Sequence, residues 1–259
     1  MSVLDRFRLD GKRFFITGGS RGLGRAMALA LAEAGADAVL VGRDAASLEQ
    51  TAADVRSLGR QALTMQADVG KPKECEAVCR QAIEQHGPID ILINNVGGRR
   101  VPTPTVDMPL DTWQELIDLN LTSTFVCTKV LGKPMIDRRS GRVINIASIS
   151  GMVANRGIGG RSYETAKAAV IQFTRATAVD WAPFGVTVNA ICPGGFMTEP
   201  NIRWSRERPE IIEAFKKEIP LGDFGQPEDL GPLAVYLASD ASRYMTGAAL
   251  VIDGGYTLL

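Results

Sequence analysis

The chain has 259 residues, enough for one large α/β domain or two small ones. Its 45% hydrophobic content can fill a core, and 29 Lys and Arg residues balance 29 Asp and Glu residues. This balance gives no net field that would attract nucleic acid or an acidic membrane, so we expect a small-molecule partner.

The N-terminal stretch "MSVLDRFRLDGKRFF" alternates charged and apolar residues. It lacks the apolar segment and small-residue cleavage site of a secretory signal. No apolar run approaches the roughly 20 residues that span a bilayer. We therefore expect a cytoplasmic protein that binds neither membrane nor nucleic acid.

Short apolar runs alternate with longer amphipathic ones along the whole chain. Runs rich in Val, Ile and Phe predict strands at 13–17, 38–41, 61–67, 90–94, 142–147, 186–191 and 249–252. Helical patterns lie between them at 24–35, 44–59, 72–87, 110–138, 162–185 and 227–239. This alternation predicts an α/β, doubly wound Rossmann fold, with about seven parallel strands flanked by helices in a single domain spanning 1–259.

Residues 193–225 carry no strand pattern and are rich in Pro, Gly and charge. Long irregular segments in compact domains often cover a functional site. We expect an irregular lid over the substrate here.

The four cysteines are Cys75, Cys79, Cys127 and Cys192, and none forms a C-x-x-C pair. Cys75 and Cys79 stand at helical spacing, so we expect buried or half-buried free thiols. His86 is the only histidine, which argues against a zinc site and against a histidine general base. We predict no metal.

The first predicted strand runs into "TGGSRGLG" at 17–24, which opens the first long helix. The glycines at 18, 22 and 24 suit a tight turn whose backbone approaches a pyrophosphate closely. The helix N-terminus would supply free N–H groups and the positive end of its dipole. A glycine cluster alone is a weak signal, but its place between the first strand and helix makes a dinucleotide site the favoured interpretation.

The end of the second predicted strand bears on the choice of cofactor. A binder of NAD(H) would carry an acid there for the ribose 2′-hydroxyl, but the strand ends at Gly42 and Arg43 follows. Arg43 and Arg21 could clamp a 2′-phosphate, which favours NADP(H). NAD(H) stays open, because Asp44 could serve the ribose if the strand ended later; its other interpretation is a helix N-cap.

The chain resembles the compact, single-domain short-chain dehydrogenases/reductases along nearly its whole length. The motifs come in the family's order: "TGGSRGLG", "ADV" at 67–69, "NNVG" at 94–97, "DLNLTS", "INIASISG", "SYETAK" and "NAICPGGFMT" at 189–198. The resemblance implies a cofactor site made of Gly18, Ser20, Arg21, Gly22, Leu23, Gly24, Arg43, Asp68, Val69, Asn95, Gly97, Tyr163, Lys167, Pro193, Gly194 and Thr198. It implies a catalytic set of Asn120, Ser148, Tyr163 and Lys167.

Three departures from the family pattern stand out. Val96 replaces the usual Ala, which we expect to be harmless. The segment between Ser148 and Tyr163 is about two residues longer than usual. It also carries Arg156 and Arg161, which leaves its conformation beside the substrate open.

Tyr163 and Lys167 stand four residues apart on a predicted helix, so their side chains share a face. Tyr163 is the only one of the four tyrosines with a lysine at this spacing. A nearby ammonium favours the phenolate, so we expect Lys167 and an oxidised nicotinamide to lower the tyrosine pKa toward neutral. Tyr163 could then exchange the proton of a substrate oxygen.

The family resemblance implies roles for the other members of the set. Ser148 would hydrogen-bond the substrate oxygen, and Lys167 would hold the nicotinamide ribose. Asn120 would hold a water that connects Lys167 to solvent. The alternatives are a strand-end cap for Ser148 and a structural role for Asn120, since a polar residue within a helix needs a partner or a bend.

Arginines gather in the segments expected to border the substrate: Arg99, Arg100, Arg156, Arg161, Arg203, Arg206 and Arg208. Most would be solvated, but one or two facing inward would suit a carboxylate or a hydroxyl-rich substrate. We expect an oxidoreductase for a small polar secondary alcohol or ketone, such as a sugar, polyol or sugar acid, similar to the family's gluconate and glucose dehydrogenases. A 3-oxoacyl-carrier-protein reductase or other carbonyl reductase, and a catalytically idle dinucleotide sensor or scaffold, are the alternatives.

Self-association is also expected. The apolar face of "AKAAVIQFTRATAVDWA" and the short C-terminal strand are elements that family members commonly pair. We expect a homotetramer, or a dimer, although the helix face could equally belong to the core.

Overall fold

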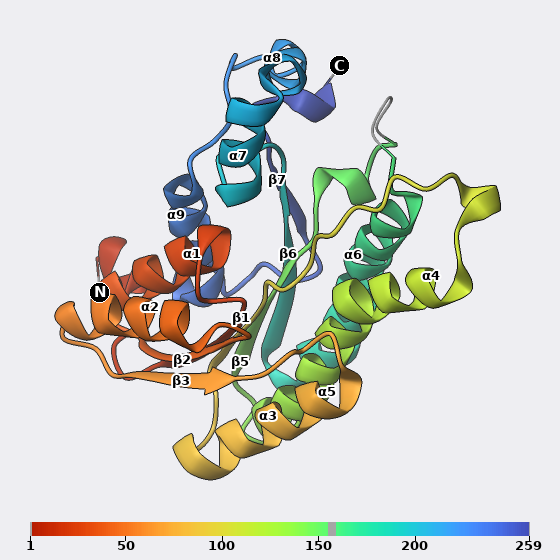
Figure 1. Ribbon diagram of the computed structural model, residues 1–259. Helices are drawn as coiled ribbons and strands as arrows, with labels where there is room; N and C mark the ends of the chain where they lie inside the picture. Colours follow the sequence, from red (N-terminus) through yellow and green to blue (C-terminus); the bar gives the residue numbers. More distant parts are fainter. Residues whose placement is uncertain (1, 155–158, 259) are drawn as a thin grey trace.

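The computed structural model describes residues 2–154 and 159–258. Over this range it contains one parallel sheet of seven strands in the order β3-β2-β1-β4-β5-β6-β7 (Figure 1). The strands are β1 (Arg13–Thr17), β2 (Asp37–Gly42), β3 (Ala62–Gln66), β4 (Ile91–Asn94), β5 (Gly141–Ile146), β6 (Val186–Pro193) and β7 (Ala249–Ile252). The predicted Rossmann fold and its strands are confirmed, with ends moved by at most two residues.

The strands are apolar on both sides because helices cover both faces of the sheet. Phe14 and Ile16 of β1 belong to one core, and Phe15 between them belongs to the other. Figure 1 shows the two helical layers on either side of the sheet. One contains α1 (Gly22–Glu33), α2 (Ala45–Ser57) and α9 (Gly231–Ala238); the other contains α3 (Pro72–His86), α5 (Ser123–Asp137) and α6 (Arg161–Trp181).

The predicted helix at 110–138 is continuous but not regular. It comprises α4 (Leu110–Ile117), a π-helical turn at Asp118–Thr122 and then α5. A π turn widens the helix by one residue and often marks a functional site. Asn120 lies within this turn.

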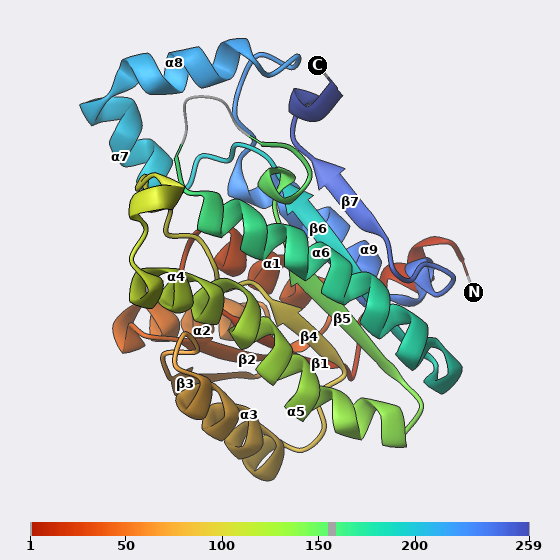
Figure 2. The ribbon, with the colours of Figure 1, turned by 90° about the vertical axis from the view of Figure 1, so that its right-hand side faces the viewer.

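The lid was predicted to be irregular, and this prediction is wrong. The segment forms α7 (Glu199–Glu207) and α8 (Pro209–Lys217), which Figure 2 shows at the end of the molecule where β6 and β7 finish. The sequence contains a signal for the start of each helix. Pro200 and Pro209 lie in the first turns of α7 and α8, where proline fits without loss of a hydrogen bond. The segment packs its own apolar cluster, in which Phe215 stacks on Tyr256 at 4.9 Å. That it covers the substrate stays a prediction.

The strand order reverses direction at β1, whose neighbours are β2 and β4. The loops after β1 and β4 therefore leave the sheet on opposite faces and open a crevice at its carboxyl edge, the usual ligand site of such sheets. The turn after β5 packs tightly on α6, because a Cβ on Gly151 would lie 2.6 Å from the backbone carbonyl carbon of Lys167. This contact fixes the distance between the end of β5 and the helix that carries Tyr163.

Candidate active site

Two adjoining cavities, of about 680 and 630 Å³, lie along the carboxyl edge of the sheet. Both are lined by Arg21, Arg43, Asn95 and Gly97, so they form one continuous cleft. All sixteen residues predicted to bind the cofactor line at least one of them, and Ser148 lines the second. Asn120 is fully buried behind the cleft.

The glycine loop has the close packing that a dinucleotide site requires. Gly18 and Gly22 have φ of 68° and 53°, which only glycine adopts readily. A Cβ on Gly24 would lie 2.1 Å from the carbonyl oxygen of Gly18. The side-chain amide of Asn95 donates to the carbonyls of Thr17 (2.9 Å) and Gly18 (3.2 Å), which ties the loop to the end of β4. The loop, the N-terminus of α1 and the length of the cleft fit a nicotinamide dinucleotide.

At the end of β2, Arg43 is exposed and lines both cavities. Asp44 is the N-cap of α2 and accepts a hydrogen bond of 2.8 Å from the amide of Ser47, as its N-cap interpretation predicted. Arg21 forms an exposed ion pair of 3.0 Å with Glu199 at the start of α7. Two guanidinium groups thus face the part of the cleft where a cofactor's ribose would lie.

Helix α6 presents Tyr163 and Lys167 to the second cavity. The Lys167 Nζ lies 5.9 Å from the centroid of the Tyr163 ring and donates to the carbonyl of Ile146 at 2.6 Å. Lys167 is buried, and desolvation lowers its pKa to about 8. Because a Cβ on Gly97 would lie 2.7 Å from Nζ, only a glycine leaves room for the ammonium there.

Ser148 follows β5 and stands beside Tyr163. Its hydroxyl accepts a hydrogen bond of 3.1 Å from the amide of Ser150, so it also caps the short turn at Ile149–Gly151. The same hydroxyl lies close enough to the phenol of Tyr163 to act toward lowering its pKa. The strand-end cap and the contact with the predicted acid/base residue are therefore both present.

Asn120 joins the loop after β4 to the α4–α5 helix. Its Oδ1 accepts from the amide of Gly98 at 2.8 Å, and its Nδ2 donates to the carbonyls of Gly98 (3.2 Å) and Leu116 (2.9 Å). A buried polar residue within a helix needs a hydrogen-bond partner or a distortion of the helix. Asn120 has both, since it bonds to Gly98 and lies in the π turn. The side chain holds the loop that contains Gly97 against the π turn.

The pKa of Tyr163 departs from the sequence-based expectation. Burial raises it above its usual value of 10, while the Ser148 hydrogen bond and the charge of Arg100 act in the opposite direction. Lys167 was expected to lower it, but the cation that acts on this phenol is Arg100. Its guanidinium carbon lies 4.5 Å from the ring centroid, closer than the ammonium of Lys167.

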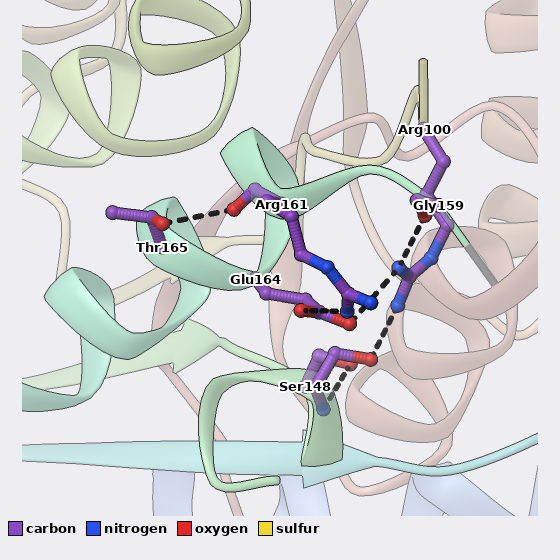
Figure 3. A network of polar contacts seen from close by, with 7 residues as sticks. Arg100, Ser148, Gly159, Arg161, Glu164 and Thr165 are labelled. Carbon is purple, nitrogen blue, oxygen red and sulfur yellow. Dashed lines mark hydrogen bonds and ion pairs between the residues drawn. The ribbon is translucent and has the colours of Figure 1, made fainter. Parts of the chain in front are cut away.

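Arg100 is the inward-facing arginine among those predicted near the substrate. It donates to the carbonyl of Gly159 at 3.2 Å and to the hydroxyl of Ser150 at 2.5 Å (Figure 3). Glu164, the residue after Tyr163, lies 3.6 Å from its guanidinium. Sequence reasoning missed Ser150, Gly159 and Glu164 as parts of this site; the signal for Glu164 was an acid placed directly beside the tyrosine.

The other predicted arginines lie on the surface or pair with acids. Arg99 pairs with Glu115 at 2.9 Å and Arg161 with Glu164 at 2.7 Å. In the lid, Arg203 and Arg208 form exposed pairs with Glu207 and Glu210, and Arg206 is exposed. Arg156 lies outside the described residues.

All four cysteines are free and buried, as predicted, and all lie in the described part of the chain. The sulfurs of Cys75, Cys79 and Cys127 meet between α3 and α5, with Cys127 Sγ 3.4 Å from Cys75 Sγ and 3.6 Å from Cys79 Sγ. Sequence spacing could not place Cys127 there. The absence of a bound metal stays a prediction.

Comparison with known proteins decides the family. A family model described as enoyl-(acyl carrier protein) reductase matches residues 18–257. The chain belongs to the short-chain dehydrogenase/reductase family. The members of this family that it resembles include a galactitol 2-dehydrogenase (L-tagatose-forming) from Cereibacter sphaeroides, 36% identical over 97% of each chain. They also include a 3-oxoacyl-[acyl-carrier-protein] reductase from Synechocystis sp., 38% identical over 94% of this chain and 96% of the other.

A solved structure of the same family is similar over its full length. It is a gluconate 5-dehydrogenase from Burkholderia cenocepacia in complex with NADP and tartrate, with a TM-score of 0.92, 35% identity and complete coverage of both chains. The chain is thus an NAD(P)-dependent oxidoreductase of this family that acts on CH–OH groups. No helix among residues 2–154 and 159–258 is long and apolar enough to cross a membrane.

Burial of Lys167 predicts a pH-dependent stability. Below about pH 8 the folded protein retains a buried ammonium, whereas from about pH 8 to 10.5 it has released this proton and the unfolded chain has not. Stability therefore rises with pH across this window. Relative to a Lys167→Met variant, the wild type should gain up to about 3 kcal/mol between pH 8 and 10.5. Urea unfolding of both proteins across this range measures it, and a constant difference between them would contradict the prediction.

Proposed function

We propose that this protein transfers a hydride between NADP(H) and a small polar secondary alcohol or ketone, such as a sugar, polyol or sugar acid. The observation that carries the proposal is the meeting of Ser148, Tyr163 and Lys167 at one end of the cleft, with Asn120 directly behind them. These four residues come from the ends of β5, from α6 and from the π turn, and each has a polar partner already in place.

When bound, the nicotinamide of the cofactor would give or accept the hydride. Tyr163 would exchange the proton of the substrate oxygen as the general acid/base, and Ser148, which already contacts the phenol, would hold that oxygen by a hydrogen bond. Lys167 would bind the nicotinamide ribose, and the charges of Arg100 and of an oxidised nicotinamide would favour the phenolate of Tyr163. Asn120 supports this arrangement by fixing Gly98, and we propose that its carbonyl end also holds a water connecting Lys167 to solvent.

The remaining contacts would hold the cofactor itself. The glycine loop and the N-terminus of α1 would bind the pyrophosphate. Asp68 and Val69 would border the adenine, and Pro193, Gly194 and Thr198 the nicotinamide. Arg21 and Arg43 would hold the 2′-phosphate, which favours NADP(H) over NAD(H).

A 3-oxoacyl-carrier-protein reductase is the second candidate, favoured by the Synechocystis relative. It differs from the first proposal in the substrate that it turns over, so assays across polyols, sugar acids and acyl thioesters separate the two.

Replacing Tyr163 by Phe tests the mechanism. The variant keeps the ring under Arg100 but removes the hydroxyl, so turnover should fall by at least about 10³-fold while cofactor affinity stays within a few-fold. Cofactor absorbance measures turnover, and fluorescence titration measures affinity. Retention of most of the activity would refute Tyr163 as the acid/base.

Replacing Arg43 by Ala tests the choice of cofactor. Loss of one charge-assisted contact with the 2′-phosphate should weaken NADP binding about 10- to 100-fold and leave NAD binding almost unchanged. Arg60→Ala, which removes a partly buried arginine at the opposite edge of the sheet, is the control. Equal losses for the two cofactors would show that Arg43 does not read the 2′-phosphate.

We also propose that the protein is a homotetramer. Phe125 on α5 and Val179 on α6 are 48% and 74% exposed, and β7 is an edge strand of the sheet. Pairing of two such faces and two such edges would bury both and give two-fold axes. Solution scattering should give about four times the 27.8 kDa chain mass; a monomer mass would end the proposal. The cytoplasmic location stays a prediction.

A further inference from the structure

Glu164 is a buried acid beside the predicted catalytic tyrosine. Its side chain is only 10% exposed, although glutamate is rarely buried without a partner. It lies 2.7 Å from Arg161 and 3.6 Å from Arg100. Figure 3 shows the two guanidinium groups converging on its carboxylate.

Arg100 lies against the predicted acid/base residue. It stacks on the face of Tyr163, and its charge also acts on Tyr256, which packs on Phe215 near the C-terminal end of the chain. Its guanidinium therefore lies next to the phenol with which a substrate oxygen would exchange its proton. An arginine in this position would ordinarily select an anionic substrate, because its fork matches a carboxylate.

This arginine is already engaged on several sides. Its two terminal nitrogens donate to Gly159 and Ser150, one face covers Tyr163, and the carboxylate of Glu164, which also pairs with Arg161, lies 3.6 Å from it. A bidentate contact of a substrate with the two terminal nitrogens would have to compete with Gly159 and Ser150. A second carboxylate would also be repelled by Glu164 in a partly desolvated site.

We propose that Glu164 is a specificity-determining residue, an internal carboxylate that occupies the arginine pair and makes the pocket select neutral polyols and ketones over sugar acids. This rests on the proposed function and narrows its substrate class. The relatives by themselves leave the choice open, since one is named for galactitol and another for gluconate. The hydroxyl groups of a neutral substrate would still form hydrogen bonds with the polar groups around Arg100, because a hydroxyl can both donate and accept without adding charge.

The test compares D-glucitol with D-gluconate, which differ only in a hydroxymethyl group against a carboxylate. For each substrate, kcat/KM is measured with NADP in the wild type and in Glu164→Gln. We expect the wild type to favour glucitol by at least about tenfold, and Glu164→Gln to shift the ratio about tenfold toward gluconate by removing the repelling charge. Glu164→Asp, which retains the charge, should keep the wild-type preference.

Asp137→Asn is the matched control, since it removes one exposed, ion-paired carboxylate at the far end of α5. It should leave the ratio unchanged, which excludes an effect of net charge alone. A wild type that prefers gluconate, or a ratio that does not move in Glu164→Gln, would overturn the proposal. If Glu164→Gln does not fold, the wild-type ratio decides.

A failure of the proposed function can be told apart from a failure of this inference. If neither sugar is turned over, calorimetry of both sugars with the enzyme–NADP complex replaces the rate measurement. Binding of gluconate as tight as that of glucitol, or tighter, would overturn the specificity proposal. The comparison of the wild type with Tyr163→Phe tests the proposed proton-transfer chemistry independently of this specificity.

Discussion

The parallel direction of the seven strands is the constraint on which the site depends. Parallel strands finish at the same edge, so residues far apart in sequence are delivered to one cleft: Gly18 after β1, Arg43 after β2, Gly97 after β4 and Ser148 after β5. The crevice opens where β1 lies between β2 and β4, because the two connections diverge there. Without this topology the glycine loop and the catalytic helix would not face each other.

Around the cleft, buried polar groups are held by protein partners. Asn120 both donates to and accepts from Gly98, Lys167 donates to the carbonyl of Ile146, and Ser148 accepts from the Ser150 amide. Each bond satisfies a group whose burial would otherwise be costly. The same bonds fix the angles at which the hydroxyl, phenol and ammonium meet, so stability and preorganisation arise from the same contacts.

Charge balance at the substrate end differs from that at the cofactor end. Arg21 and Arg43 face the cleft from exposed positions and are able to meet phosphate. Arg100 is instead held by Glu164, Gly159 and Ser150 and is stacked on Tyr163. The arginines at the cofactor end are exposed, and Arg21 pairs with one acid, Glu199, whereas Arg100 is partly buried and surrounded by protein groups.

The sequence by itself determined the strand–helix alternation, the glycine loop, the motif residues that gather in the cleft and the N-cap at Asp44. These are local signals: periodicity, glycine where a turn needs it, and side chains that cap their own helix. It did not determine the two helices within residues 193–225, because a segment rich in proline and glycine is also typical of irregular chain.

The tertiary structure alone decided which arginine turns inward and which cation faces Tyr163. Arg99 and Arg100 are neighbours with identical chemistry, yet one pairs with Glu115 on the surface and the other meets Glu164 and the tyrosine ring. Their positions depend on partners 16 to 64 residues away, and no local pattern encodes such distances. For the same reason the three-sulfur contact between α3 and α5 became visible only when the helices packed.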